Sequence, residues 1–221
     1  IYYIESSKAS FNIKDQIKSE KLYITQGFIG SDPNHFSVTL GREGSDYSAA
    51  IFAYCLDAKS VTIWKDVPGV LNADPRYFED TTLLNQISYR EAIELAFYGA
   101  SVIHPKTLQP LQKKEIPLYV KSFVNPTLPG TSVSRGAILE PFVPCFIVKK
   151  NQLLISISSK DFSFIMESQV SEIFKWFGEN HIKVNVIQNS AISFTVCVED
   201  KFNNFETLNQ ELSKNFNVSF D

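Results

Sequence analysis

Residues Thr39–Ala50, TLGREGSDYSAA, place two glycines, an arginine and an aspartate directly before an alanine-rich run. Apolar residues recur at helical spacing through Ala58, so the stretch predicts a bend between a strand and a helix capped by Ser45 or Asp46. The glycines allow close backbone approach, the helix start offers unpaired N–H groups, and Arg42 adds a guanidinium suited to a carboxylate or phosphate. The stretch therefore predicts an anion site. Taken alone, an ordinary tight turn with Arg42 in a surface ion pair explains it equally well.

The segments around this bend alternate between strand and helix character. β-Branched and aromatic residues predict strands at 22–29, 37–40, 60–66 and 116–123, the first of them buried. Apolar residues at helical spacing predict helices at 46–58, at 88–99 and from 104 onward. Such alternation is typical of an α/β layered domain with a largely parallel sheet.

Residues at the predicted helix ends have the chemistry of caps. Ser88 and Glu91 have the spacing of a capping box, and Gly99 follows where a left-handed cap would end the same helix. His104 precedes Pro105, a residue that favours the first helical turn. We therefore expect His104 to have a structural role at a helix start rather than a catalytic one.

Proline and glycine are frequent between residues 125 and 145, where the hydrophobic periodicity disappears. This composition predicts a linker at 131–145, between a first domain at 1–130 and a second domain at 146–221. In the second domain, the pattern predicts strands at 153–158, 184–188, 192–199 and from 218, with helices at 164–181 and 205–216. That order is a βαββαβ unit of ferredoxin-like type. The first of its helices carries an apolar stripe, namely Met166, Val170, Ile173, Phe174 and Phe177.

Composition and charge limit the kinds of partner. The chain has 221 residues, 21 Lys and Arg against 24 Asp and Glu, and a net charge of −3. Neither nucleic acid nor an anionic membrane is indicated, and a small-molecule partner is expected. Three scattered cysteines are too few for a disulfide framework or a zinc site. No apolar run approaches the roughly 20 residues of a membrane span, so we expect a soluble, cytoplasmic protein.

Five segments resemble the aspartokinase family in order and spacing. They are GFIGS, TLGREGSDYSAA, TIWKDVPGVLNADPR, ISYREAIELAFYGASVIHPKTLQPL and IPLYVKSFVNPTLPGT, and they run from Tyr23 to Thr131. This part is similar to the second half of the family's catalytic domain, which implies part of an amino acid kinase-type α/β/α sandwich. The βαββαβ unit resembles the first ACT regulatory domain of the same family.

The resemblance implies the transfer of the γ-phosphoryl group of ATP, with Mg²⁺ held largely by the nucleotide, to the side-chain carboxylate of L-aspartate. A carboxylate with a pKa of about 3.9 is ionised at neutral pH, so this chemistry needs no general base. Catalysis by such a site depends on positioning and on electrostatic stabilisation of the phosphates. No metal ligands from the protein itself are expected.

The site residues implied by the resemblance form two sets. Arg42 would bind the α-carboxylate of aspartate and Asp46 the amino group, with Thr39 and Ser45 lining the same site. The cofactor-binding set for ATP is Lys65, Asp66, Leu71, Asp74, Arg76, Ser101 and Val102. Within it, Lys65 and Asp66 match positions on the adenine and ribose side, and Asp74 and Arg76 match positions that close on the phosphates.

The chain also departs from the family pattern. Glu43 replaces a commoner third glycine, Ser101 a commoner lysine and Leu71 a commoner tyrosine. The family's phosphate-binding KFGGTS segment does not occur in these 221 residues. We therefore expect the chain to be a fragment of an aspartokinase that is inactive by itself.

The ACT resemblance implies a binding site for a feedback amino acid, lysine or threonine, between paired domains of a homodimer. The corresponding positions are Ser163, Met166, Gln169, Val170, Val184, Asn185, Asn189 and Ser190. Asn185 replaces the aspartate of lysine-sensitive relatives, which weakens the case for lysine. One alternative remains open, a non-catalytic, amino-acid-sensing regulatory subunit. A second alternative is a kinase of the same superfamily that acts on glutamate or a nucleotide monophosphate, but LGREGSD together with DVPGVLNADPR and the ACT-like unit argues against it.

Overall fold

The computed structural model describes residue 17, residues 21–99 and residues 102–221. The chain divides into two compact units, with the boundary between Val148 and Lys149. Each unit has its own hydrophobic core, as the composition allows. Among the described residues, no helix combines the length and the apolar character needed to cross a membrane.

The first unit is built on a four-stranded sheet. Its strands, in spatial order, are β3 (Val61–Lys65), β5 (Leu118–Ser122), β6 (Thr131–Ser134) and β4 (Gln86–Ser88). The pairs β3–β5 and β4–β6 are parallel and the pair β5–β6 is antiparallel, so the expected largely parallel sheet is confirmed. A separate antiparallel hairpin consists of β1 (Ile29–Ser31) and β2 (Ser37–Thr39).

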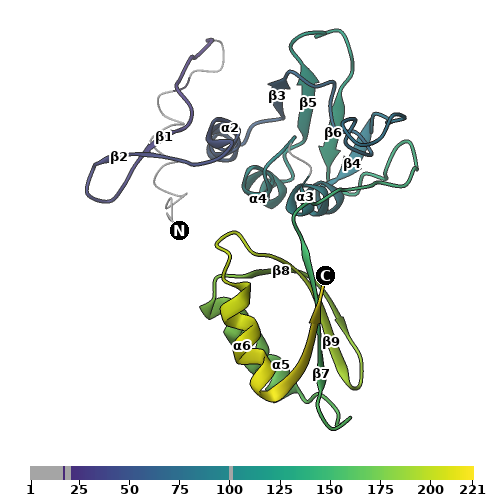
Figure 1. Ribbon diagram of the computed structural model, residues 1–221. Coiled ribbons are helices and arrows are strands. Elements are labelled where there is room, and N and C mark those ends of the chain that lie inside the picture. The colour runs from purple at the N-terminus through teal and green to yellow at the C-terminus, as the bar shows by residue number, and fades with distance from the viewer. Residues whose placement is uncertain (1–16, 18–20, 100–101) are drawn as a thin grey trace. The chain divides into compact units, whose positions relative to one another are not determined.

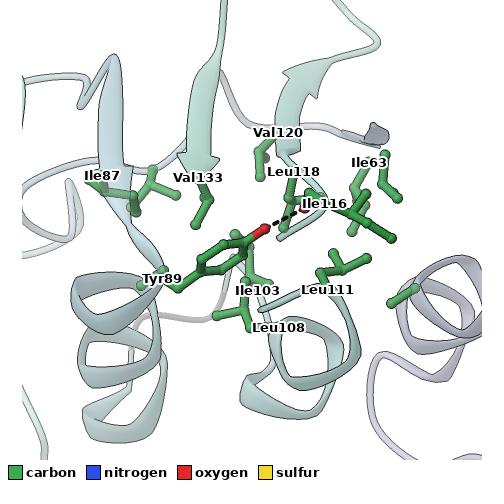
Figure 2. Packing of buried hydrophobic residues seen from close by; sticks show 14 of the residues in the cluster. Ile63, Ile87, Tyr89, Ile103, Leu108, Leu111, Ile116, Leu118, Val120 and Val133 are labelled. Carbon is green, nitrogen blue, oxygen red and sulfur yellow. Dashed lines mark hydrogen bonds between the residues drawn. The ribbon is translucent and has the colours of Figure 1, made fainter. Parts of the chain in front are cut away.

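Three helices cover one face of this sheet (Figure 1): α2 (Gly44–Leu56), α3 (Tyr89–Tyr98) and α4 (Pro105–Lys114). Successive strand residues alternate between buried and exposed. In β3, Val61 and Ile63 are buried beneath the helices, whereas Trp64 faces away from them and is exposed. Figure 2 shows the core between the two layers, where the Tyr89 hydroxyl donates a hydrogen bond to the carbonyl of Ile116. The described residues thus form two of the three layers expected for an α/β/α sandwich.

The predicted helix ends of α3 and α4 are confirmed. The Ser88 Oγ accepts a hydrogen bond from the Glu91 N–H at 3.2 Å, and the Glu91 carboxylate accepts one from the Ser88 N–H at 2.8 Å. Gly99 ends α3 with a φ of 134°. The Nδ1 of His104 accepts from the Lys106 N–H at 3.1 Å, which gives this histidine the structural role that the sequence predicts.

Two local predictions near the bend are wrong. Residues 22–28 form no strand, and the side chains of Leu22 and Ile24 are 91% and 93% exposed. β-Propensity produces a strand only where a neighbour accepts its backbone hydrogen bonds, and no strand in the described part of the chain pairs with these residues. Neither Ser45 nor Asp46 caps α2, because the helix begins at Gly44, two residues before the predicted start at residue 46. Glu43 occupies the cap position with a left-handed φ of 55° and makes no side-chain cap bond.

The prediction of a linker at 131–145 is also wrong. Thr131–Ser134 is strand β6, which pairs with both β5 and β4 inside the first unit. Downstream, Glu140 exchanges backbone hydrogen bonds with Gln86, and the Phe146 N–H donates to the Asn72 carbonyl at 2.7 Å. Proline and glycine interrupt the hydrophobic periodicity here, but backbone pairing still ties the segment to the first unit.

The second unit has the predicted βαββαβ order. Its elements are β7 (Leu153–Ser159), α5 (Glu167–Glu179), β8 (Lys183–Asn189), β9 (Ser193–Glu199), α6 (Phe205–Asn215) and β10 (Phe216–Phe220). All pairings are antiparallel and the spatial order is β10-β7-β9-β8, which confirms the ferredoxin-like topology.

The apolar stripe predicted for the first helix of this unit is only partly correct. Ile173 and Phe177 are buried in the core, as expected. Met166 precedes α5 and is 55% exposed, and Phe174 is also exposed. Trp176 completes the buried face instead, since it lies three residues after Ile173 and next to Phe177 on the same side of the helix.

Candidate functional site

The bend before α2 depends on its two glycines. Gly41 has a φ of +80°, a conformation that glycine adopts at little cost. At Gly44, a Cβ atom would lie 2.9 Å from the Phe28 ring and 3.0 Å from the Leu40 Cβ, so any side chain would clash. The Ser48 hydroxyl accepts from the Phe28 N–H at 3.0 Å and donates to the Gly44 carbonyl at 2.9 Å. These contacts hold the start of the hairpin against the first turn of α2.

The polar side chains of the bend differ in exposure. Thr39, Arg42 and Ser45 are exposed, so all three are accessible to a ligand. Glu43 is only partly exposed, and its Oε2 is buried without a hydrogen-bond partner among the described residues. The glutamate that replaces the family's third glycine therefore does not turn fully into solvent.

Asp46 lies in the first turn of α2, where it pairs with Lys65 at the end of β3. The Lys65 Nζ is 2.6 Å from the Asp46 Oδ2, and the two side chains are 21% and 12% exposed. Helix α2 precedes β3 and packs against it, so the start of the helix lies at the carboxyl end of the strand. In open α/β sheets, ligand sites occur at the carboxyl ends of strands.

A cavity of about 470 Å³ begins at the next residue, Asp66. It gathers five of the seven predicted cofactor-binding residues, namely Asp66, Leu71, Asp74, Arg76 and Val102. Lys65 directly precedes the cavity, and Ser101 lies outside the described residues. One wall, formed by residues 146–148, is not expected from the sequence, because these residues follow the predicted linker and are expected to begin the second domain.

The loop beneath this cavity is anchored to strand β6 and to the segment that follows it. The Val70 N–H donates to the Thr131 Oγ1 at 2.8 Å, and Gly69, with a φ of +151°, lets the backbone pass close to that hydroxyl. The Asn72 side chain accepts from the Thr82 N–H at 2.7 Å and donates to the Pro144 carbonyl at 3.0 Å. Two sides of the cavity, separated by about 70 residues in sequence, are thereby held together.

Asp74 and Arg76 form a compact pair at the cavity. The Arg76 Nε lies 3.0 Å from both carboxylate oxygens of Asp74, and the Arg76 NH2 lies 2.6 Å from Oδ2. Hydrogen bonds from the side chain and the backbone N–H of Arg76 lower the pKa of Asp74. Arg76 is exposed, so this arrangement orients a guanidinium that remains accessible from solvent.

The predicted effector-binding residues fall into two groups at opposite ends of the second unit. Ser163, Met166, Gln169 and Val170 lie around the start of α5, near the β8–β9 turn that carries Asn189 and Ser190. The Ile165 N–H donates to the Ala191 carbonyl at 3.0 Å, which joins these two segments. Val184 and Asn185 lie at the other end of β8, roughly 15 Å from Asn189 at the usual rise per strand residue. One unit alone therefore does not bring all eight residues together.

Several of these side chains already have partners inside the unit. The Gln169 Oε1 accepts from the Met166 N–H at 2.9 Å, and the Ser190 and Ser193 hydroxyls are 2.7 Å apart. The Asn185 Oδ1 accepts from the Lys149 Nζ at 2.9 Å, and its Nδ2 donates to the Gln152 Oε1 at 2.5 Å. A ligand that uses Asn185 would have to compete with Lys149 and Gln152.

Comparison with known proteins shows the family to which the chain belongs. The profile of the amino acid kinase family matches residues 5–122, which is more than half of the chain. The chain belongs to the amino acid kinase family. The matched region contains the bend, the Asp46–Lys65 pair and all of the cavity except the wall at 146–148.

Within this family, the chain is similar to aspartokinases, which confirms the resemblance found in the sequence. Lysine-sensitive aspartokinase 3 of Escherichia coli (strain K12) is 37% identical over 183 residues, which cover 82% of this chain and 40% of that protein. The Clostridium acetobutylicum aspartate kinase structure has a TM-score of 0.84 at 25% identity and covers 99% of this chain and 52% of that one.

Two crystal structures of Escherichia coli aspartokinase III are also similar. One, in complex with lysine and aspartate, has a TM-score of 0.75 at 33% identity. The other, with aspartate and ADP, has a TM-score of 0.75 at 32% identity. Both cover 98% of this chain, and the chain spans 49% of their length. The amino acid kinase fold expected from the sequence is therefore confirmed for this chain, which corresponds to about half of those proteins.

Proposed function

We propose that the protein containing this chain transfers the γ-phosphoryl group of ATP to the side-chain carboxylate of L-aspartate. The observation that carries the proposal is the arrangement of the first unit. It places a bend with Arg42 and Asp46 at the carboxyl end of β3, directly before a cavity lined by the predicted nucleotide residues. The similar Escherichia coli enzyme binds aspartate and ADP together, which supports the same pairing of ligands here.

The bend is the proposed amino acid site. The exposed guanidinium of Arg42 binds the α-carboxylate in a bidentate manner, and the Asp46 carboxylate binds the ammonium group. The hydroxyls of Thr39 and Ser45 line the same site. Two opposite charges recognise the two ends of the α-amino acid group, which leaves the substrate's side chain free to react.

The cavity is the proposed nucleotide site. Its volume of about 470 Å³ lies within the range of small-molecule sites, and valine, leucine and isoleucine side chains offer apolar walls for a base. Asp66 and the Asp74–Arg76 pair supply polar groups for the ribose and the phosphates. In the described part of the chain, no three His, Cys, Asp or Glu side chains form a cluster that could hold a metal ion. In this proposal, Mg²⁺ is assigned to the nucleotide phosphates, as in other phosphoryl transfers.

The residues of this chain act on the reaction by positioning and charge. The attacking group is a carboxylate with a pKa of about 3.9, so it needs no base at neutral pH. This carboxylate must approach a negatively charged triphosphate, so catalysis requires cations that reduce the repulsion between the two anions. Arg42 and Asp46 hold the amino acid in one orientation, and Arg76 offsets phosphate charge at the cavity.

We further propose that the second unit binds a feedback amino acid, lysine or threonine, in a homodimer. Its βαββαβ fold is that of the resembled ACT domain, and the similar Escherichia coli enzyme binds lysine together with aspartate. Strand β8 is at the edge of its sheet, with Val186 and Ile187 exposed. Pairing of two copies would bring Val184 and Asn185 of one copy towards the α5 start of the other.

The proposed function is tested by measuring ADP release from the full-length protein with MgATP and L-aspartate. Aspartate-dependent release is expected, with glutamate and UMP as matched alternative acceptors. Turnover with one of these acceptors and none with aspartate would assign the protein to another kinase of the family. Binding of lysine or threonine without any turnover would favour the regulatory subunit instead.

A further inference from the structure

Lys65 lies between the bend and the cavity. It is the last residue of β3 and pairs with Asp46 on α2, and the next residue, Asp66, lines the cavity. Because the exposed fractions of the pair are only 21% and 12%, bulk water screens it weakly. At this distance the two charges neutralise each other.

The charged groups of the cavity lining do not by themselves neutralise a bound phosphate. The lining contains two carboxylates, Asp66 and Asp74, and one guanidinium, Arg76, which Asp74 already binds. A phosphate that enters this cavity thus meets more negative than positive lining groups. The Lys65 ammonium sits on a flexible four-carbon stem one residue before Asp66, so a rotamer change can turn it towards such a phosphate.

We propose that Lys65 couples the amino acid site to the nucleotide cavity by exchanging partners. Without ligands it neutralises Asp46, as the structure shows. When the ammonium group of the amino acid occupies Asp46, Lys65 turns to a phosphate of the nucleotide. The inference rests on the proposed function, because it takes both ligands from that proposal.

Competition for one carboxylate drives the exchange. Two ammonium groups on Asp46 repel each other, and the weak screening at this position makes the repulsion significant. A phosphate in the cavity offers Lys65 an alternative anion, which in turn frees Asp46 for the amino acid. By linkage, each ligand must then increase the affinity for the other by the same factor.

The test is the dissociation constant of ADP for the full-length protein, measured by calorimetry with and without saturating L-aspartate. In the wild type, aspartate should tighten ADP binding by a factor on the order of five or more. Lys65→Met should remove this difference and leave ADP weakly bound in both conditions. Asp46→Asn should have the opposite effect, because it frees Lys65 permanently and should tighten ADP binding without aspartate.

Lys114→Met is the matched control, since Lys114 also forms an ion pair with an aspartate, Asp57, in the same unit. This variant should retain the wild-type coupling. The inference is overturned if aspartate still tightens ADP binding in Lys65→Met. It is also overturned if Asp46→Asn weakens ADP binding, which is the result expected if the substitution only disturbs the local structure. Aspartate-dependent ADP release by a wild type without coupling would overturn the inference but leave the proposed function intact. Absence of aspartate binding in the wild type would overturn both.

Discussion

The Thr131 hydroxyl accepts a hydrogen bond from the Val70 N–H at 2.8 Å, across 61 residues of sequence. Both residues are buried, and the bond joins the first residue of β6 to the loop that lines the cavity. Because of this contact, the shape of the cavity depends on strand β6, which comes later in the sequence than every predicted substrate- and nucleotide-binding residue.

Replacement of Thr131 tests this dependence. Thr131→Val keeps the side-chain shape but leaves the buried Val70 N–H without its acceptor, which should lower the free energy of unfolding by about 1–3 kcal/mol. The Michaelis constant for ATP should rise, whereas that for aspartate should change little. Thr131→Ser retains the acceptor and is the control. Urea unfolding and steady-state kinetics provide the readout, and equal behaviour of the two variants would contradict the prediction.

Gly69 should be intolerant of a side chain. A Cβ at this position would lie 2.5 Å from the Thr131 Oγ1 and 2.9 Å from the Leu83 Cδ1, and its φ of +151° disfavours other residues. Gly69→Ala is therefore expected to destabilise the protein by more than about 1 kcal/mol and to weaken nucleotide binding. Gly178→Ala is the matched control. It lies in α5 with no atom near the added Cβ, and should be neutral or stabilising by up to about 1 kcal/mol. Thermal unfolding distinguishes the two.

The proposed role of Arg42 predicts a selective kinetic defect. In the full-length protein, Arg42→Ala should raise the Michaelis constant for aspartate far more than that for ATP, because it removes the bidentate partner of the α-carboxylate. Arg90→Ala is the control, since Arg90 is likewise exposed but lies on α3, outside both proposed ligand sites. Equal increases for both substrates in Arg42→Ala would show that Arg42 has been assigned to the wrong ligand.

Tyr89 predicts a loss of stability at alkaline pH. Burial, with a contribution from the charge of Glu115, raises the pKa of Tyr89 to about 12, from 10.0. A raised pKa contributes stability that is present below pH 10 and lost as the pH rises through 12. Between pH 9 and 11.5, the wild type should lose about 2 kcal/mol more than Tyr89→Phe, which lacks the ionisable group. Urea unfolding at each pH measures the difference, and parallel curves would contradict the prediction.

Much of the fold follows from local rules. The capping box of Ser88 and Glu91, the His104 helix start and the βαββαβ order all depend on residues near one another in sequence. The expected site residues come from the resemblance to the aspartokinase family, because glycines and charges at short spacing do not by themselves distinguish an anion site from an ordinary turn. The prediction that Leu22–Ile29 is a buried strand is wrong because a strand forms only when it pairs with a neighbouring strand. Local sequence does not show whether such a neighbour is present.

Local sequence predicts the helices and strands in most of the chain, and the segments that resemble the amino acid kinase family. Tertiary contacts alone show that residues 131–148 belong to the first unit, that residues 146–148 form a cavity wall, and that Lys65 pairs with Asp46. Helix caps and hydrophobic periodicity act over a few residues. Strand pairing and buried ion pairs depend on contacts between distant segments, which exist only once the chain has folded.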